Sequence, residues 1–107
     1  DLQIDKATAI SGSGPGFVFN IIDGMEKAAI TLGFKKNVAK ILVEQTFKGS
    51  INLLLDLKID PEKLVNMVAT KGGTTEAGLK VMQKYKMHNI FKNLTKASFN
   101  KAKKQGR

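Results

Sequence analysis

The sequence contains no cysteine and only one histidine, His88. It therefore has neither a disulfide framework nor the usual ligand set of a zinc or iron site, and we expect no bound metal. Its apolar runs, such as Leu53–Leu55, fall far short of the stretch of about 20 residues that spans a bilayer. These absences exclude a disulfide-stabilised scaffold and a membrane protein, and we expect the protein in the cytoplasm.

Acidic residues are absent after Glu76, although the whole chain carries 9 Asp and Glu against 18 Lys and Arg. The entire net charge of +9 therefore lies in residues 77–107. A lysine-rich helix face there could contact phosphates, but tryptophan is absent and Arg107 is the only arginine. Charge runs are usually solvated, so we favour a solvent-facing final helix. A basic, all-helical nucleic-acid-binding or protein-interaction module remains the alternative.

The apolar residues that are present recur with helical periodicity, which predicts an all-α fold in one compact domain over residues 1–107. We expect about five helices: 15–32, 37–56, a short one beginning at Pro61, one from Thr74 or Thr75 to about Tyr85, and 88–104. The first two are apolar around much of their circumference. Three small helices cannot cover that surface, which favours a partner, most simply a second copy of the chain.

A first glycine-rich segment, Ser11–Gly16, precedes the first expected helix. It resembles a dinucleotide-binding fingerprint only superficially, because Phe17 stands where the third glycine belongs and Pro15 lacks a backbone N–H. We therefore assign no cofactor-binding residue in this chain. Small residues here allow another backbone or a ligand to approach a buried helix closely.

A second glycine-rich segment joins two expected helices and has the composition of an anion-binding loop. Backbone N–H groups in the first turn of a helix lack intrahelical partners, and the helix dipole is positive there. Threonine hydroxyls and a lysine add donors and charge, so the segment predicts a carboxylate or phosphate pocket. A plain interhelical turn with a threonine cap fits the same residues equally well. The candidate substrate-binding residues are Thr70, Lys71, Gly72, Gly73, Thr74 and Thr75.

Two blocks of sequence resemble the C-terminal domain of pyrroline-5-carboxylate reductases: A-T-A-I-S-G-S-G-P-G-F-V at 7–18 and G-G-T-T-E-A-G-L at 72–79. The resemblance covers essentially the whole chain. It implies an enzyme that reduces 1-pyrroline-5-carboxylate to proline with NADPH or NADH. It also implies a helical domain that interlocks as a homodimer, and dimers that can assemble further. The cofactor would be bound by an N-terminal Rossmann domain that this chain lacks, so we expect the chain alone to be inactive.

The resemblance also implies roles for individual residues. Thr75 is expected to hydrogen-bond the substrate, and Thr8 to supply a further active-site hydroxyl that faces the nicotinamide and the substrate. Thr70, Gly73 and Thr74 would line a pocket for the substrate carboxylate. Departures from the family pattern are Gly16 for alanine, Thr70 and Lys71 for Ser-Pro, and Glu76 for a commonly apolar residue. Loss of the proline gives the loop more freedom, and Lys71 places a cation beside the expected pocket.

Overall fold

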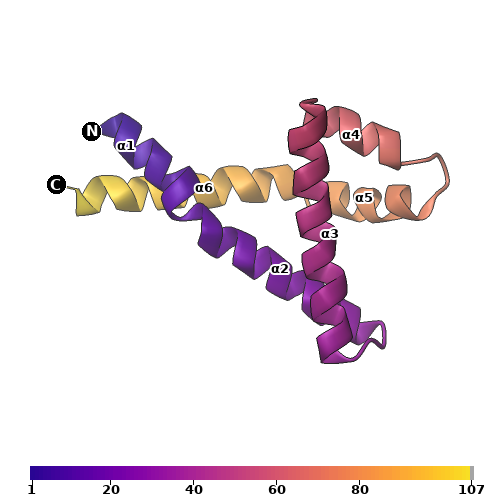
Figure 1. Ribbon diagram of the computed structural model, residues 1–107. Coiled ribbons are helices and arrows are strands. Elements are labelled where there is room, and N and C mark those ends of the chain that lie inside the picture. The colour runs from indigo at the N-terminus through magenta and orange to yellow at the C-terminus, as the bar shows by residue number, and fades with distance from the viewer. Residues whose placement is uncertain (107) are drawn as a thin grey trace. The chain divides into compact units, whose positions relative to one another are not determined.

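The computed structural model describes residues 1–106, and these residues contain helices and no strands (Figure 1). The prediction of an all-α fold is confirmed. The elements in chain order are α1 (Leu2–Ala7), a π-helix η1 (Thr8–Gly12), α2 (Gly14–Thr31), α3 (Lys36–Leu57), α4 (Pro61–Val68), α5 (Thr74–Lys84) and α6 (Met87–Gln105).

The five expected helices correspond to α2–α6, and their predicted ends agree within one residue wherever both ends were predicted. Recognisable residues mark several of these ends. Gly33, with φ of +113°, follows α2, and Pro61 occupies the first turn of α4. Lys58, the C-cap of α3, and Lys86, the N-cap of α6, lie in the left-handed region despite their side chains, each with φ of 52°.

The sequence pattern does not predict α1 and η1. Asp1 caps α1 by accepting a hydrogen bond from Ile4 N at 2.9 Å. The helix then widens into η1, where Ser13 N donates to Thr8 O, five residues earlier, at 2.8 Å. The first part of the glycine-rich segment Ser11–Gly16 is thus helical rather than a loop.

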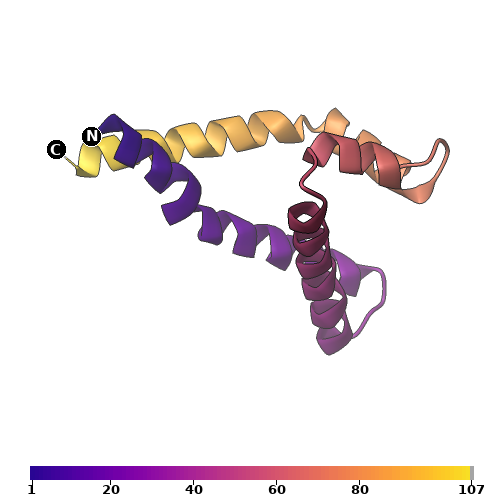
Figure 2. The same cartoon turned by 45° about the horizontal axis from the view of Figure 1, so that its top comes forward.

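The chain divides into two units, and the first comprises Asp1–Ile21 together with the C-terminal stretch from Met82 on. Within it α6 packs against α1 and η1, so that the N-terminal helix lies beside the end of α6 (Figures 1 and 2). Ala9 is buried at 3% exposure. Ser98 Oγ on α6 donates to Ser13 Oγ at 2.9 Å, which joins α6 to the junction of η1 and α2. Small side chains permit this close helix contact.

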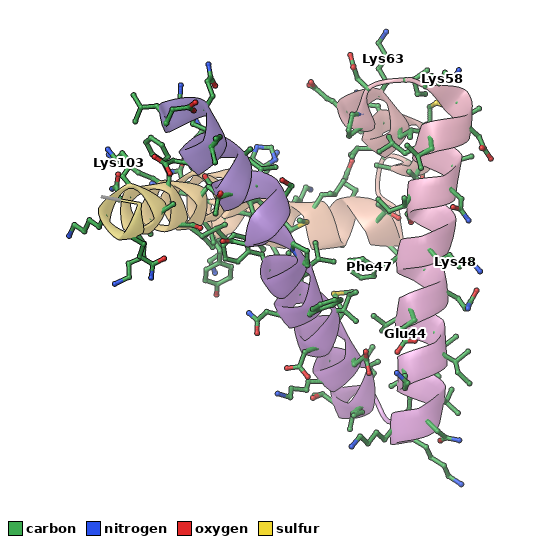
Figure 3. The ribbon with its side chains drawn as sticks, turned by 60° about the vertical axis from the view of Figure 1, so that its left-hand side comes forward. Glu44, Phe47, Lys48, Lys58, Lys63 and Lys103 are labelled. Atoms are coloured by element: carbon green, nitrogen blue, oxygen red, sulfur yellow. The ribbon has the colours of Figure 1, made fainter. Side chains whose placement is uncertain are left out.

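The second unit, Ile22–Val81, carries α3, α4 and adjoining parts of α2 and α5. Phe47 and Lys48 project to opposite sides of α3, as expected for a helix with an apolar and a polar face (Figure 3). Its charged pairs are local: Lys27 Nζ lies 2.8 Å from Asp23 Oδ2, one helical turn away. That hydrogen bond raises the pKa of the Lys27 ammonium above its usual value.

Few side chains are buried within the described part of the chain. The buried apolar residues are Ala9, Ala39 and Val43. Large apolar side chains are instead solvent-exposed, among them Phe19 at 68%, Ile41 at 61% and Leu55 at 65% exposure. This agrees with the surplus of apolar surface predicted from the helical pattern. None of the described helices is both long and apolar enough to cross a membrane.

Candidate functional site: the glycine turn before α5

Thr70, Lys71, Gly72 and Gly73 form a tight turn between α4 and α5, which we call the glycine turn. Gly73 N donates to Thr70 O at 2.9 Å, closing the turn. Gly72 has φ of +75°, whereas Lys71 is not in the left-handed region. This combination matches a type II turn, in which glycine is favoured at the third position and proline at the second. Lys71 therefore stands where a proline would fit.

Gly73 is required for a different reason from Gly72. A Cβ at this position would lie 2.5 Å from Thr70 Oγ1 and 3.1 Å from Thr70 O. The hydroxyl could rotate away, but the carbonyl oxygen belongs to the backbone of the same turn. The two glycines therefore allow the backbone to fold back so that α5 begins directly after it.

Glu76 closes over the glycine turn from the first turn of α5. Its Oε1 accepts a hydrogen bond from Gly72 N at 3.1 Å and lies 3.6 Å from Lys80 Nζ. The Glu76 side chain is about one-third exposed, at 34%. Sequence reasoning missed this contact, although an acid at the third position of a helix, reaching back over its start, is a known capping pattern.

The start of α5 keeps hydrogen-bond donors available. The N–H groups of Gly72 and Gly73 are satisfied by Glu76 and Thr70. Among residues 1–106, by contrast, the backbone N–H groups of Thr74 and Thr75 have no acceptor, and both residues are exposed. Lys71 is also exposed. Unpaired N–H groups, a positive helix end and nearby hydroxyls can together bind a carboxylate.

Thr8, the other predicted catalytic residue, lies in the first unit, whereas the glycine turn lies in the second. Thr8 Oγ1 donates to Ile4 O at 2.9 Å, so its proton is engaged while its oxygen can still accept. A Cβ on Gly12 would lie 3.4 Å from Thr8 Cγ2, which is close packing. The catalytic roles of Thr8 and Thr75 remain predictions.

No cluster of three or more histidine, aspartate or glutamate residues that could hold a metal ion occurs in the described part of the chain. A dinucleotide does not fit Ser11–Gly16 either. Gly12 belongs to η1, and Gly14 and Gly16 belong to α2, where Gly16 N donates to Ser13 O at 3.0 Å. These residues form helices and not the open phosphate loop that a Rossmann fingerprint requires.

Residues 1–105 match the family model described as pyrroline-5-carboxylate reductase dimerisation. The chain belongs to this family. A pyrroline-5-carboxylate reductase of Bacillus subtilis is 48% identical over 81 residues, which are 76% of this chain and 29% of that protein. The reductase of Aquifex aeolicus is 34% identical over 94% of this chain and 38% of its own length. The chain thus spans about a third of the length of such relatives.

Solved structures of pyrroline-5-carboxylate reductases share the fold. The Coxiella burnetii enzyme is 36% identical with a TM-score of 0.93, covering 97% of this chain and 38% of that one. The Plasmodium falciparum pyrroline carboxylate reductase, solved with NADP bound, is 31% identical, with a TM-score of 0.95. This match covers 100% of this chain and 41% of the Plasmodium chain. The family resemblance of the two sequence blocks is therefore confirmed.

Proposed function

We propose that this chain is the dimerisation and substrate-binding part of an enzyme that reduces 1-pyrroline-5-carboxylate to proline with NADPH or NADH. The observation that carries the proposal is the match of residues 1–105 to the reductase dimerisation family. The NADP in the Plasmodium falciparum relative supports a nicotinamide cofactor. In this proposal, residues 1–107 act as one helical domain of a cytoplasmic enzyme, and a Rossmann domain outside them binds the cofactor.

The glycine turn supplies the substrate-binding groups in this proposal. The carboxylate of the pyrroline ring accepts hydrogen bonds from the N–H groups of Thr74 and Thr75, with the α5 dipole and the Lys71 ammonium favouring its charge. The Thr75 hydroxyl hydrogen-bonds the substrate, and Thr70 lines the pocket. Gly72 and Gly73 contribute through the shape of the turn, because their N–H groups already have acceptors.

Reduction adds a hydride to the imine carbon and a proton to the ring nitrogen. The cofactor supplies the hydride, and the task of this chain is to hold the ring in place for that transfer. Fixing the carboxylate at the start of α5 orients the ring, and the proton for the ring nitrogen comes from water or a nearby donor. Thr8 is proposed as an additional hydroxyl near the substrate and the nicotinamide, contributed from η1.

Homodimer formation belongs to the same proposal, and dimers can assemble further. Exposed apolar side chains on α2 and α3 offer the surface that a second copy would cover. The partner copy would thereby complete the core that these helices leave open, and it would contribute to each active site.

The direct test is turnover by the whole protein that contains this chain. Incubated with 1-pyrroline-5-carboxylate and NADPH or NADH, it is expected to form proline, whereas residues 1–107 alone are expected to form none. A whole protein that is folded and dimeric but leaves this substrate unreduced would refute the substrate assignment. A salt-sensitive gel shift with DNA or RNA would instead support the alternative of a nucleic-acid-binding module.

A further inference from the structure

The glycine turn has no proline at its second position, although its geometry would accept one. Its second position favours proline, whose ring presets φ. This chain has Lys71 instead, which leaves the backbone more conformations to lose when the turn forms. Something else must therefore hold the turn that leads into α5.

Glu76 makes a contact that can hold the glycine turn in place. Its Oε1 bonds to the N–H of Gly72, the residue whose φ of +75° defines the turn. Lys80, one helical turn further along α5, lies 3.6 Å from the same carboxylate oxygen. The carboxylate is thus held between a backbone donor in the turn and a cation on the helix.

We propose that Glu76 is a positioning residue that replaces the proline restraint. It fixes Gly72, which keeps the N–H groups of Thr74 and Thr75 directed at the carboxylate of the substrate. The role deepens the proposed reductase function and depends on it. Glu76 does not touch the substrate and acts through the glycine turn.

The hydrogen bond and the negative charge of Glu76 should have opposite effects on substrate binding. A negative charge near a carboxylate-binding site opposes binding, and the Lys80 ammonium offsets this only in part because it is 73% exposed. Glutamine keeps an acceptor oxygen in the same place without the charge. E76Q should therefore bind the substrate at least as well as the unaltered protein, whereas E76A should bind it less well.

The experiment compares E76Q, E76A, K71P and the double variant K71P/E76A in the whole protein. Steady-state kinetics give KM for 1-pyrroline-5-carboxylate and kcat, and hydrogen exchange reports the Gly72 amide. E62A is the matched control, since Glu62 is an acid in the first turn of α4. Circular dichroism confirms that each variant is folded.

E76A is expected to raise KM and to speed Gly72 exchange by about two- to tenfold, the range that one hydrogen bond supplies, with kcat nearly unchanged. E76Q and E62A should leave the Gly72 exchange rate close to that of the unaltered protein. In the K71P background, E76A should change KM and Gly72 exchange little, because proline presets the turn without Glu76. Comparison with K71P alone removes the effect of losing the Lys71 ammonium.

Two results would overturn the proposal: unchanged KM and unchanged Gly72 exchange in E76A, or an effect of E76A in the folded K71P protein as large as in the unaltered protein. Failure of the reductase assignment looks different. The unaltered protein would then not reduce pyrroline-5-carboxylate, while the Gly72 exchange rates of the same variants would still show whether Glu76 restrains the turn.

Discussion

Gly73 and Gly72 are intolerant of a side chain for separate physical reasons. A Cβ at Gly73 would lie 2.5 Å from Thr70 Oγ1 and tight against Thr70 O at 3.1 Å, and one at Gly72 is strained at φ of +75°. We predict that G73A and G72A each destabilise the protein by about 1–2 kcal/mol and raise KM for the substrate. Urea denaturation and kinetics measure the two effects. G78A is the control, because a Cβ at Gly78 of α5 meets nothing within 4 Å among residues 1–106.

Thr8 can be tested against a threonine that makes the same local contact. Thr8 Oγ1 donates to Ile4 O at 2.9 Å, and Thr31 Oγ1 donates to Lys27 O at 3.1 Å. T8V and T31V therefore lose equivalent hydrogen bonds and should change thermal stability equally. We predict that only T8V lowers kcat/KM, by about three- to tenfold, as expected for one lost active-site hydrogen bond. Equal kinetics in the two variants would remove Thr8 from the active site.

The candidate site was only partly predictable from its residues. The segment Thr70–Thr75 suggested free donors at a helix start, and Thr74 and Thr75 have them. The sequence did not indicate that the N–H groups of Gly72 and Gly73 are already engaged. The contact of Glu76 was also missed. An acid at the third position of a helix is a capping signal, but which N–H it reaches depends on how the turn folds back.

The Ser13–Ser98 contact links elements that are far apart in sequence. Both residues are partly buried, so losing one hydroxyl leaves the other without its partner. We predict that S98A destabilises the protein by about 1 kcal/mol, and that S13A/S98A costs less than the sum of the single changes. S50A is the control, since the exposed Ser50 hydroxyl bonds only within its own helix, to Thr46 O at 2.7 Å. Strict additivity in chemical denaturation would contradict the coupling.

Helices α2–α6 were predictable because each has a long apolar pattern or a clear boundary, such as Gly33 or Asp60-Pro61. The elements α1 and η1 were not, since they are too short for a periodic signal. Packing decides their structure: α6 lies against both elements, and Ala9 is buried. Such tertiary stabilisation is invisible to local sequence analysis.

For the molecule as a whole, the apolar side chains left open on α2 and α3 determine its expected association. Leu55 on α3 is 65% exposed, and the neutral, exposed Gln45 lies on the same helix. We predict that L55E shifts the protein from dimer to monomer, because a charge cannot be buried unpaired in an apolar interface. Q45E adds the same charge at a position that is already polar and should shift the dimer less than L55E does. Size-exclusion chromatography with light scattering distinguishes the two outcomes.

The central claim is that these helices are a dimerisation domain, and the molar mass of the isolated chain in solution tests it most directly. Sedimentation equilibrium of residues 1–107 is predicted to give twice the 11.7 kDa of one chain, together with a helical circular dichroism spectrum. A folded, helical chain that sediments as an 11.7 kDa monomer at micromolar concentration would contradict the account.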